Sequence, residues 1–214
     1  MAFPRAALFD LDGTLLDSAP DMLATVNRMR AARDMGPITL AELRPVVSKG
    51  ARAMSAVAFP RLDPEQVAGL VPEFLYIYRQ ELGRHSRPFD GVEELLAALE
   101  AAGTTWGIVT NKPEYLAREI IPQLGWQSRC AVLVGGDSLA ERKPHPLPLL
   151  HLADALGAPP DRCLMVGDSE TDFLAARAAG VPVVLVSYGY RRHFDLHAAG
   201  ALAVIDHFDE LLSL

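Results

Sequence analysis

The 214-residue chain has few cysteines and no long hydrophobic run. Cys130 and Cys163 each precede a short apolar run, where a small buried thiol is the ordinary expectation. A disulfide scaffold and a zinc site are both disfavoured, because the two cysteines do not stand at metal-ligand spacing. No apolar run reaches the ~18 residues of a membrane span, and the apolar run before the first acid is too short for a signal-peptide core. We therefore expect a cytoplasmic protein without a membrane anchor.

Basic residues are in the minority. Lys and Arg total 20 against 27 Asp and Glu, which gives a formal net charge of −7. Nucleic acids bind basic surfaces, so this balance argues against a nucleic-acid partner. A small anionic substrate remains compatible with it, because one lysine, a cation and backbone amides are enough to hold a phosphate locally. The charge leaves both a monomer and a homodimer open.

The composition is otherwise that of a globular protein, with 50% hydrophobic and 22% charged residues. Short apolar runs alternate with stretches of helical periodicity, a pattern typical of α/β proteins. The runs lack polar alternation, which indicates strands buried on both faces of a parallel sheet. We therefore expect a doubly wound, Rossmann-like parallel sheet. Its predicted strands are Ala6 to Asp10, Trp106 to Thr110, Ala131 to Val134, Leu164 to Val166, Val183 to Val186 and Ala203 to Ile205.

About ninety-five residues separate the first two predicted strands, far more than an ordinary strand-helix-strand unit requires. We expect an inserted helical cap domain at residues 17–85, and a core domain made of residues 1–16 and 86–214. Apolar spacing of three and four residues, with Pro and Gly between the segments, predicts four cap helices. They are Asp21 to Arg33, Leu40 to Val47, Ala51 to Phe59 and Pro64 to Leu82.

Polar residues follow four of the apolar runs. They are Asp10 and Asp12; Thr110, Asn111 and Lys112; Lys143; and Asp168 and Asp172. Ligands of open α/β sheets bind beyond the carboxyl ends of the strands, where these side chains would converge. Carboxylates that lie close together repel, and a hard cation such as Mg²⁺ removes that cost. Such a cation would also bind a phosphate, and the set resembles one that carries out phosphoryl transfer through an aspartyl-phosphate.

The ordered set resembles the four motifs of the haloacid dehalogenase-superfamily phosphatases, over essentially the whole chain. Its segments are Asp10-Leu11-Asp12-Gly13-Thr14, Thr110-Asn111, Lys143 and Gly167-Asp168-Ser169-Glu170-Thr171-Asp172. The resemblance implies that Asp10 is the nucleophile and that Asp12 is the general acid and base. An acid at position 12 distinguishes these phosphatases from true dehalogenases.

The same resemblance implies the remaining roles. Asp10, Asp168 and the backbone carbonyl of Asp12 would bind Mg²⁺, and Asp172 would be a further ligand or support one. Thr110 and Asn111 would bind phosphate, and Lys143 would neutralise charge on the nucleophile and the phosphoryl group. A phosphomutase of the same superfamily and a non-catalytic module that kept the fold are the alternatives.

Two branches of the superfamily compete for the substrate. The insert, Lys143-Pro144-His145-Pro146 and Ser187-Tyr188-Gly189-Tyr190 resemble the phosphoglycolate phosphatases. Ser48 to Met54, His85-Ser86 and Trp106 to Pro113 resemble the N-acetylmuramic acid 6-phosphate phosphatases of cell-wall recycling. We expect a small phosphorylated organic acid or sugar acid as substrate, with 2-phosphoglycolate the first choice. Cap residues that would bind its far end are Ser48, Lys49 and Arg52.

Overall fold

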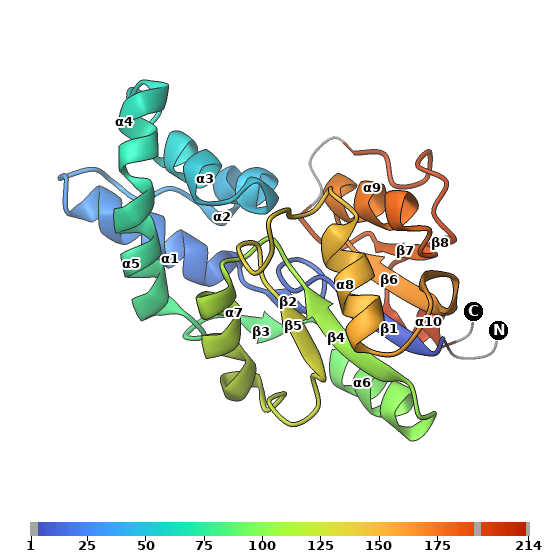
Figure 1. The fold of residues 1–214 in the computed structure, drawn as a ribbon. Helices are drawn as coiled ribbons and strands as arrows, with labels where there is room; N and C mark the ends of the chain where they lie inside the picture. The colour runs from blue at the N-terminus through green and yellow to red at the C-terminus, as the bar shows by residue number, and fades with distance from the viewer. Residues whose placement is uncertain (1–3, 191–193, 213–214) are drawn as a thin grey trace. The chain divides into compact units, whose positions relative to one another are not determined.

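A six-stranded sheet forms the centre of the fold (Figure 1). Its order is β5-β4-β1-β6-β7-β8, and every neighbouring pair of strands is parallel. This order confirms the expected doubly wound sheet. The strands are β1 (Ala6–Phe9), β4 (Thr105–Val109), β5 (Val132–Val134), β6 (Cys163–Gly167), β7 (Val183–Val186) and β8 (Ala203–Ile205). The computed structural model describes residues 4–190 and 194–212.

Helices cover both faces of this sheet, because successive residues of a strand point to opposite sides. Ala6 and Leu8 of β1 belong to the core cluster that also contains side chains of α8 (Leu147–Ala155) and α9 (Glu170–Ala179). Ala7, between them, lies on the other face with leucines of α6 (Val92–Ala101). The remaining helical elements of the core are α7 (Glu114–Ile120), α10 (Phe208–Leu211) and the 3-10 turns η2 (Ile121–Leu124) and η3 (Pro160–Arg162).

The chain divides into two units. Unit 1 contains Met1–Leu16 and Pro88–Leu214, and unit 2 contains Asp17–Arg87. Short strands β2 (Leu16–Asp17) and β3 (Arg87–Pro88) form a separate two-stranded sheet at the points where the chain passes between the units. Unit 2 is helical, with α1 packed against α5. Its elements are α1 (Ala19–Ala31), α2 (Leu40–Leu43), the 3-10 helix η1 (Arg44–Lys49), α3 (Ala51–Ala58), α4 (Pro64–Gly69) and α5 (Val71–Glu81).

The helix expected from Pro64 to Leu82 is in fact two helices. Helix α4 ends at Gly69 and α5 begins at Val71. Pro72 explains the break, because proline has no N–H and its ring clashes with the carbonyl group four residues earlier. It is tolerated within the first turn of a new helix, which is where it lies in α5. Pro45 acts similarly in the predicted Leu40 to Val47 helix, which continues after Leu43 as the 3-10 helix η1.

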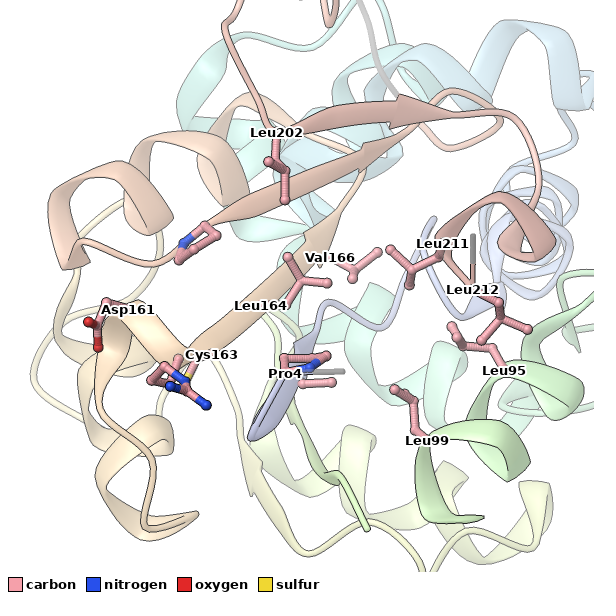
Figure 2. A pocket seen from close by; sticks show the side chains of 13 residues that line it. Pro4, Leu95, Leu99, Asp161, Cys163, Leu164, Val166, Leu202, Leu211 and Leu212 are labelled. Atoms are coloured by element: carbon pink, nitrogen blue, oxygen red, sulfur yellow. The ribbon is translucent and has the colours of Figure 1, made fainter. Parts of the chain in front are cut away.

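An apolar pocket of about 360 Å³ lies beside α6 (Figure 2). Cys163 begins β6, and Pro182 and Leu202 directly precede β7 and β8, so the pocket opens at the edge where the strands begin. Asp10, Thr110 and Asp168 follow the carboxyl ends of their strands, at the opposite edge of the sheet. This pocket is therefore separate from the candidate active site. No helix in the described part of the chain is long and apolar enough to cross a membrane.

Candidate active site

The sheet has a topological switch point next to β1. The chain passes from β1 to β4 and β5 on one side, and then returns to β6, β7 and β8 on the other side of β1. Connections that leave in opposite directions open a crevice at the carboxyl ends of the two strands. Asp10 directly follows β1 and Asp168 directly follows β6. The two predicted metal ligands therefore lie on either side of this crevice.

Three buried carboxylates meet at this point. Oxygens of Asp10, Asp168 and Asp172 lie within 4.8 Å of one another. Asp10 is 8% exposed, and the other two are fully buried. Burial raises the pKa of Asp10 from 3.8 to about 6, against the charge of Lys143, and the charge of Asp172 adds to the increase. Burial also raises the pKa of Asp168, and the charges of Asp172 and Asp10 raise it further.

Lys143 supplies positive charge to this cluster. Its Nζ lies 2.9 Å from Asp10 Oδ1 and 2.6 Å from Asp172 Oδ1, and it donates a hydrogen bond to the carbonyl of Val109 at 2.6 Å. Burial alone would lower the pKa of Lys143, but the charges of Asp10 and Asp172 outweigh burial and raise it. The lysine is therefore held as an ammonium beside the predicted nucleophile.

Asp168 is held by a loop and two glycines. The backbone N–H of Tyr190 donates to Asp168 Oδ2 at 2.5 Å. A Cβ at Gly189 or Gly13 would overlap with the Asp168 side chain, so these two positions leave the room that the carboxylate fills. Among the described residues, no hydrogen-bond donor reaches Asp168 Oδ1, although this atom is buried. A buried carboxylate oxygen without a donor suits a metal ion, because cations bind such oxygens directly.

Asp172 differs from Asp168 in that both of its oxygens have partners. Oδ1 pairs with Lys143, and Oδ2 accepts from the backbone N–H of Ser169 at 3.0 Å and from its hydroxyl at 2.5 Å. The Ser169 contacts form a capping box at the start of α9. Asp172 thus ties Lys143 to the first turn of α9, while Asp10 and Asp168 fit direct metal binding better.

Asp12 has a partner that the sequence analysis did not assign. Lys112 Nζ lies 3.1 Å from both Oδ1 and Oδ2 of Asp12. The side chain of Lys112 is 2% exposed and that of Asp12 is 16% exposed. The signal in the sequence was the position of Lys112 at a strand end, directly after two predicted phosphate-binding residues. A single lysine at such a place also suits a solvent-exposed loop, so its partner could not be predicted.

The predicted phosphate-binding residues lie at the end of β4. Thr110 is buried, and its Oγ1 accepts a hydrogen bond from the backbone N–H of Lys112 at 3.2 Å. Asn111 donates from Nδ2 to the carbonyl of Lys143 at 2.9 Å, which links the two loops. Within the described ranges, the buried atoms Asn111 Oδ1 and Thr14 Oγ1 have no hydrogen-bond partner. Both are polar groups that a bound ligand can satisfy.

The predicted cap residues belong to unit 2. Ser48 and Lys49 end η1, and Arg52 lies in the first turn of α3. All three are exposed, and Arg52 donates to the carbonyl of Pro64 at 3.2 Å. The structure therefore brings together the residues predicted in unit 1, while these three residues belong to unit 2.

Known proteins resemble this chain in sequence and in fold. The family model described as haloacid dehalogenase-like hydrolase matches residues 7–186. A phosphoglycolate phosphatase of Xanthomonas campestris is 66% identical over 191 residues, which cover 89% of this chain and 86% of that protein. An N-acetylmuramic acid 6-phosphate phosphatase of Pseudomonas aeruginosa is 46% identical over 212 residues, 98% of this chain and 94% of that protein. A crystal structure described as a predicted phosphoglycolate phosphatase from Haemophilus somnus superposes with a TM-score of 0.88. It is 30% identical, and the match covers 100% of this chain and 98% of that one.

Proposed function

The chain belongs to the haloacid dehalogenase-like hydrolases, and we propose that it is a phosphatase that converts 2-phosphoglycolate and water to glycolate and phosphate. The observation that carries the reaction type is the buried carboxylate cluster with Lys143 at the switch point of the sheet. The choice of 2-phosphoglycolate is supported by relatives of that name at 64% and 66% identity over most of the chain.

The proposed mechanism has two steps that use the same pair of acids. In the first step a carboxylate oxygen of Asp10 forms a bond to phosphorus while the bond from phosphorus to the glycolate oxygen breaks. Asp12 donates its proton to the departing oxygen. In the second step water attacks the phosphorus of the phospho-aspartate and Asp12 takes a proton from that water. Phosphate leaves, and Asp10 is regenerated as a carboxylate. Lys143 keeps a positive charge beside Asp10 in both steps.

The residues present fit a divalent cation, and we propose Mg²⁺. Asp10, Asp168 and the backbone carbonyl of Asp12 would hold it, with Asp172 beside them. Support comes from the buried oxygen Oδ1 of Asp168, which no donor in the described residues reaches, and from the three acids whose oxygens lie within 4.8 Å of one another. When bound, the cation would supply positive charge that screens the phosphate from the anionic nucleophile.

Phosphate binding in this proposal uses the end of β4. Thr110 and Asn111 would donate to phosphate oxygens, because their side chains lie at the same edge of the sheet as Asp10. We further propose that unit 2 selects the leaving group through Ser48, Lys49 and Arg52, whose exposed side chains carry a hydroxyl and two positive charges. A carboxylate on the substrate is the natural partner of such groups.

A second candidate substrate is N-acetylmuramic acid 6-phosphate. The relative of that name from Pseudomonas aeruginosa is less similar, but the match extends over 98% of this chain. Muramic acid also carries a carboxylate, so the same cap cations suit it. The two candidates differ mainly in the size of the leaving group.

Phosphate release tests both the reaction and the substrate. The purified protein is assayed with Mg²⁺ on each of the two phosphate esters, and kcat/KM is compared. Asp10→Asn protein, prepared in the same way, serves as the control for contaminating phosphatases. We expect Mg²⁺-dependent release with a preference for 2-phosphoglycolate, and no turnover by Asp10→Asn. A preference for the muramic acid ester would replace the substrate, and wild-type rates in Asp10→Asn would remove Asp10 as the nucleophile.

A further inference from the structure

Lys112 is a buried cation that the proposed mechanism does not use. The chain has only three lysines, at positions 49, 112 and 143, against seventeen arginines. Two of these lysines are buried, and each pairs with one of the two acids of the first motif: Lys143 with Asp10 and Lys112 with Asp12. Lysine carries a compact ammonium group on a narrow aliphatic chain, whereas arginine would need room for its planar guanidinium group. Its use at these two positions points to a confined space with a specific partner.

Hydrogen bonds fix both backbone polar groups of Lys112. Its N–H donates to Thr110 Oγ1 at 3.2 Å, and its carbonyl accepts from the N–H of Gly136 at 2.8 Å. Pro113 follows, and α7 begins at Glu114. With a side chain 2% exposed, the ammonium group has little freedom to move away from Asp12. This arrangement differs from a surface ion pair, in which both side chains move and the contact contributes little.

We propose that Lys112 is a positioning residue that holds the Asp12 carboxyl group in the orientation needed for proton transfer: one oxygen keeps the ammonium as its partner, while the other carries the proton that passes to the leaving-group oxygen. The ammonium lies 3.1 Å from each carboxylate oxygen, so it restrains the rotation of the carboxylate as well as its place. Without this restraint the Asp12 side chain, which is 16% exposed, gains access to other rotamers. The inference rests on the proposed function, because it assigns Lys112 an effect only through Asp12.

The choice of substrate gives the first test. An alkyl phosphate needs a proton on its leaving oxygen, whereas p-nitrophenyl phosphate releases a stable phenolate that needs none. Lys112→Met keeps the stem and removes the charge. The alkyl ester used is whichever of 2-phosphoglycolate and N-acetylmuramic acid 6-phosphate the wild-type protein hydrolyses with the higher kcat/KM. For this ester we expect kcat/KM to fall about a hundredfold, which is the effect of displacing a catalytic group by roughly 1 Å. For p-nitrophenyl phosphate we expect a fall of less than about tenfold. Equal falls on the two esters would overturn the proposal.

A double-mutant cycle gives the second test. In an Asp12→Asn background, Lys112→Met should lower kcat/KM for the alkyl ester by no more than about twofold, because the group through which it acts is already changed. A further fall as large as that of the single variant would show that Lys112 acts independently of Asp12 and would overturn the proposal. The double variant removes both charges of the pair, so no unpaired charge is left in the interior. It should therefore fold even where Lys112→Met folds poorly. If Lys112→Met does not fold, it is replaced in both tests by Lys112→Gln, whose side chain retains a hydrogen-bond donor.

Arg118→Met is the matched control. Arg118 lies on α7, close in sequence to Lys112, and its ion pair with Glu114 is exposed. Its removal should leave kcat/KM unchanged on both esters. Asp10→Asn separates this inference from the proposed mechanism: wild-type turnover in that variant would remove Asp10 as the nucleophile and with it the proposed mechanism. An inactive Asp10→Asn together with equal falls for Lys112→Met on both esters would refute only the role of Lys112.

Discussion

Gly189 has no side chain because Asp168 occupies the space where one would lie. Its φ lies outside the left-handed region, so the requirement for glycine here is steric. Gly189→Ala should displace the Asp168 carboxylate and so weaken the proposed metal binding. We expect the rise in Tm caused by Mg²⁺ to be lost or strongly reduced, as measured by thermal unfolding with Mg²⁺ and with EDTA. Gly69→Ala is the control, since a Cβ there meets nothing within 4 Å. A wild-type response to Mg²⁺ in Gly189→Ala would contradict the steric argument.

The raised pKa of Asp10 predicts how stability depends on pH. An acid with a folded-state pKa of about 6, above its unfolded value of 3.8, holds its proton more tightly in the folded protein. The protein without metal should therefore lose stability as the pH rises from about 4 through 6, by an amount of the order of 1–3 kcal/mol. A cation requires the ionised carboxylate, so the stabilisation by Mg²⁺ should grow over the same range. Thermal unfolding at pH 5.0 and 7.5 measures both effects. A gain in Tm from Mg²⁺ that is equal at both pH values would contradict this prediction.

The sequence predicted strands better than helix boundaries. Strands β7 and β8 match their predicted limits, because each apolar run ends at a polar residue, Ser187 after β7 and Asp206 after β8. The break at Leu70 was missed, because apolar spacing continues across it and only Gly69 and Pro72 interrupt the helical pattern. Asp10 and Asp168 could be identified because each directly follows a strand, and Asp12 and Asp172 because they lie in the same two motifs. The partner of Lys112 could not be identified, because Asp12 lies 100 residues away in the sequence.

Asp21 joins two distant elements of unit 2. It lies in the first turn of α1, is fully buried, and accepts hydrogen bonds from the N–H groups of Gly83 and His85 and from the hydroxyl of Ser86. The segment after α5 is thus fixed to the start of α1. Asp21→Ala should lower the free energy of unfolding by about 3 kcal/mol or more, because buried donors lose a charged acceptor. Denaturant titration measures this loss.

Asp63→Ala is a matched control for this prediction. Asp63 also accepts from two backbone N–H groups, those of Glu65 and Gln66, but it does so as the exposed N-cap of α4. Its removal should cost about 1 kcal/mol, the usual contribution of an N-cap. Similar losses in the two variants would show that the burial of Asp21 adds nothing, and that this contact is an ordinary cap.

The two units of the molecule carry different kinds of residue. Unit 1 holds the acids and the two lysines that pair with them, gathered beyond the carboxyl ends of the strands of one sheet. The exposed cations predicted to select the substrate, Lys49 and Arg52, belong to unit 2. If chemistry and selection are divided in this way, substitutions in the two units should have different consequences. Changes in unit 1 should affect every phosphate ester, and changes in unit 2 only esters with a suitable leaving group.

Lys49→Ala and Arg52→Ala test this division. Each variant removes one of the two exposed cations that are proposed to bind the carboxylate of the leaving group together. Loss of one charge-assisted hydrogen bond should lower kcat/KM for 2-phosphoglycolate roughly ten- to a hundredfold. For p-nitrophenyl phosphate, which has no carboxylate, the change should stay within about twofold. Parallel steady-state assays on both esters measure the difference, and Arg61→Ala, another cation of unit 2 with an exposed side chain, is the control. Equal losses on both esters would place the effect on the phosphoryl chemistry and remove these residues from substrate selection.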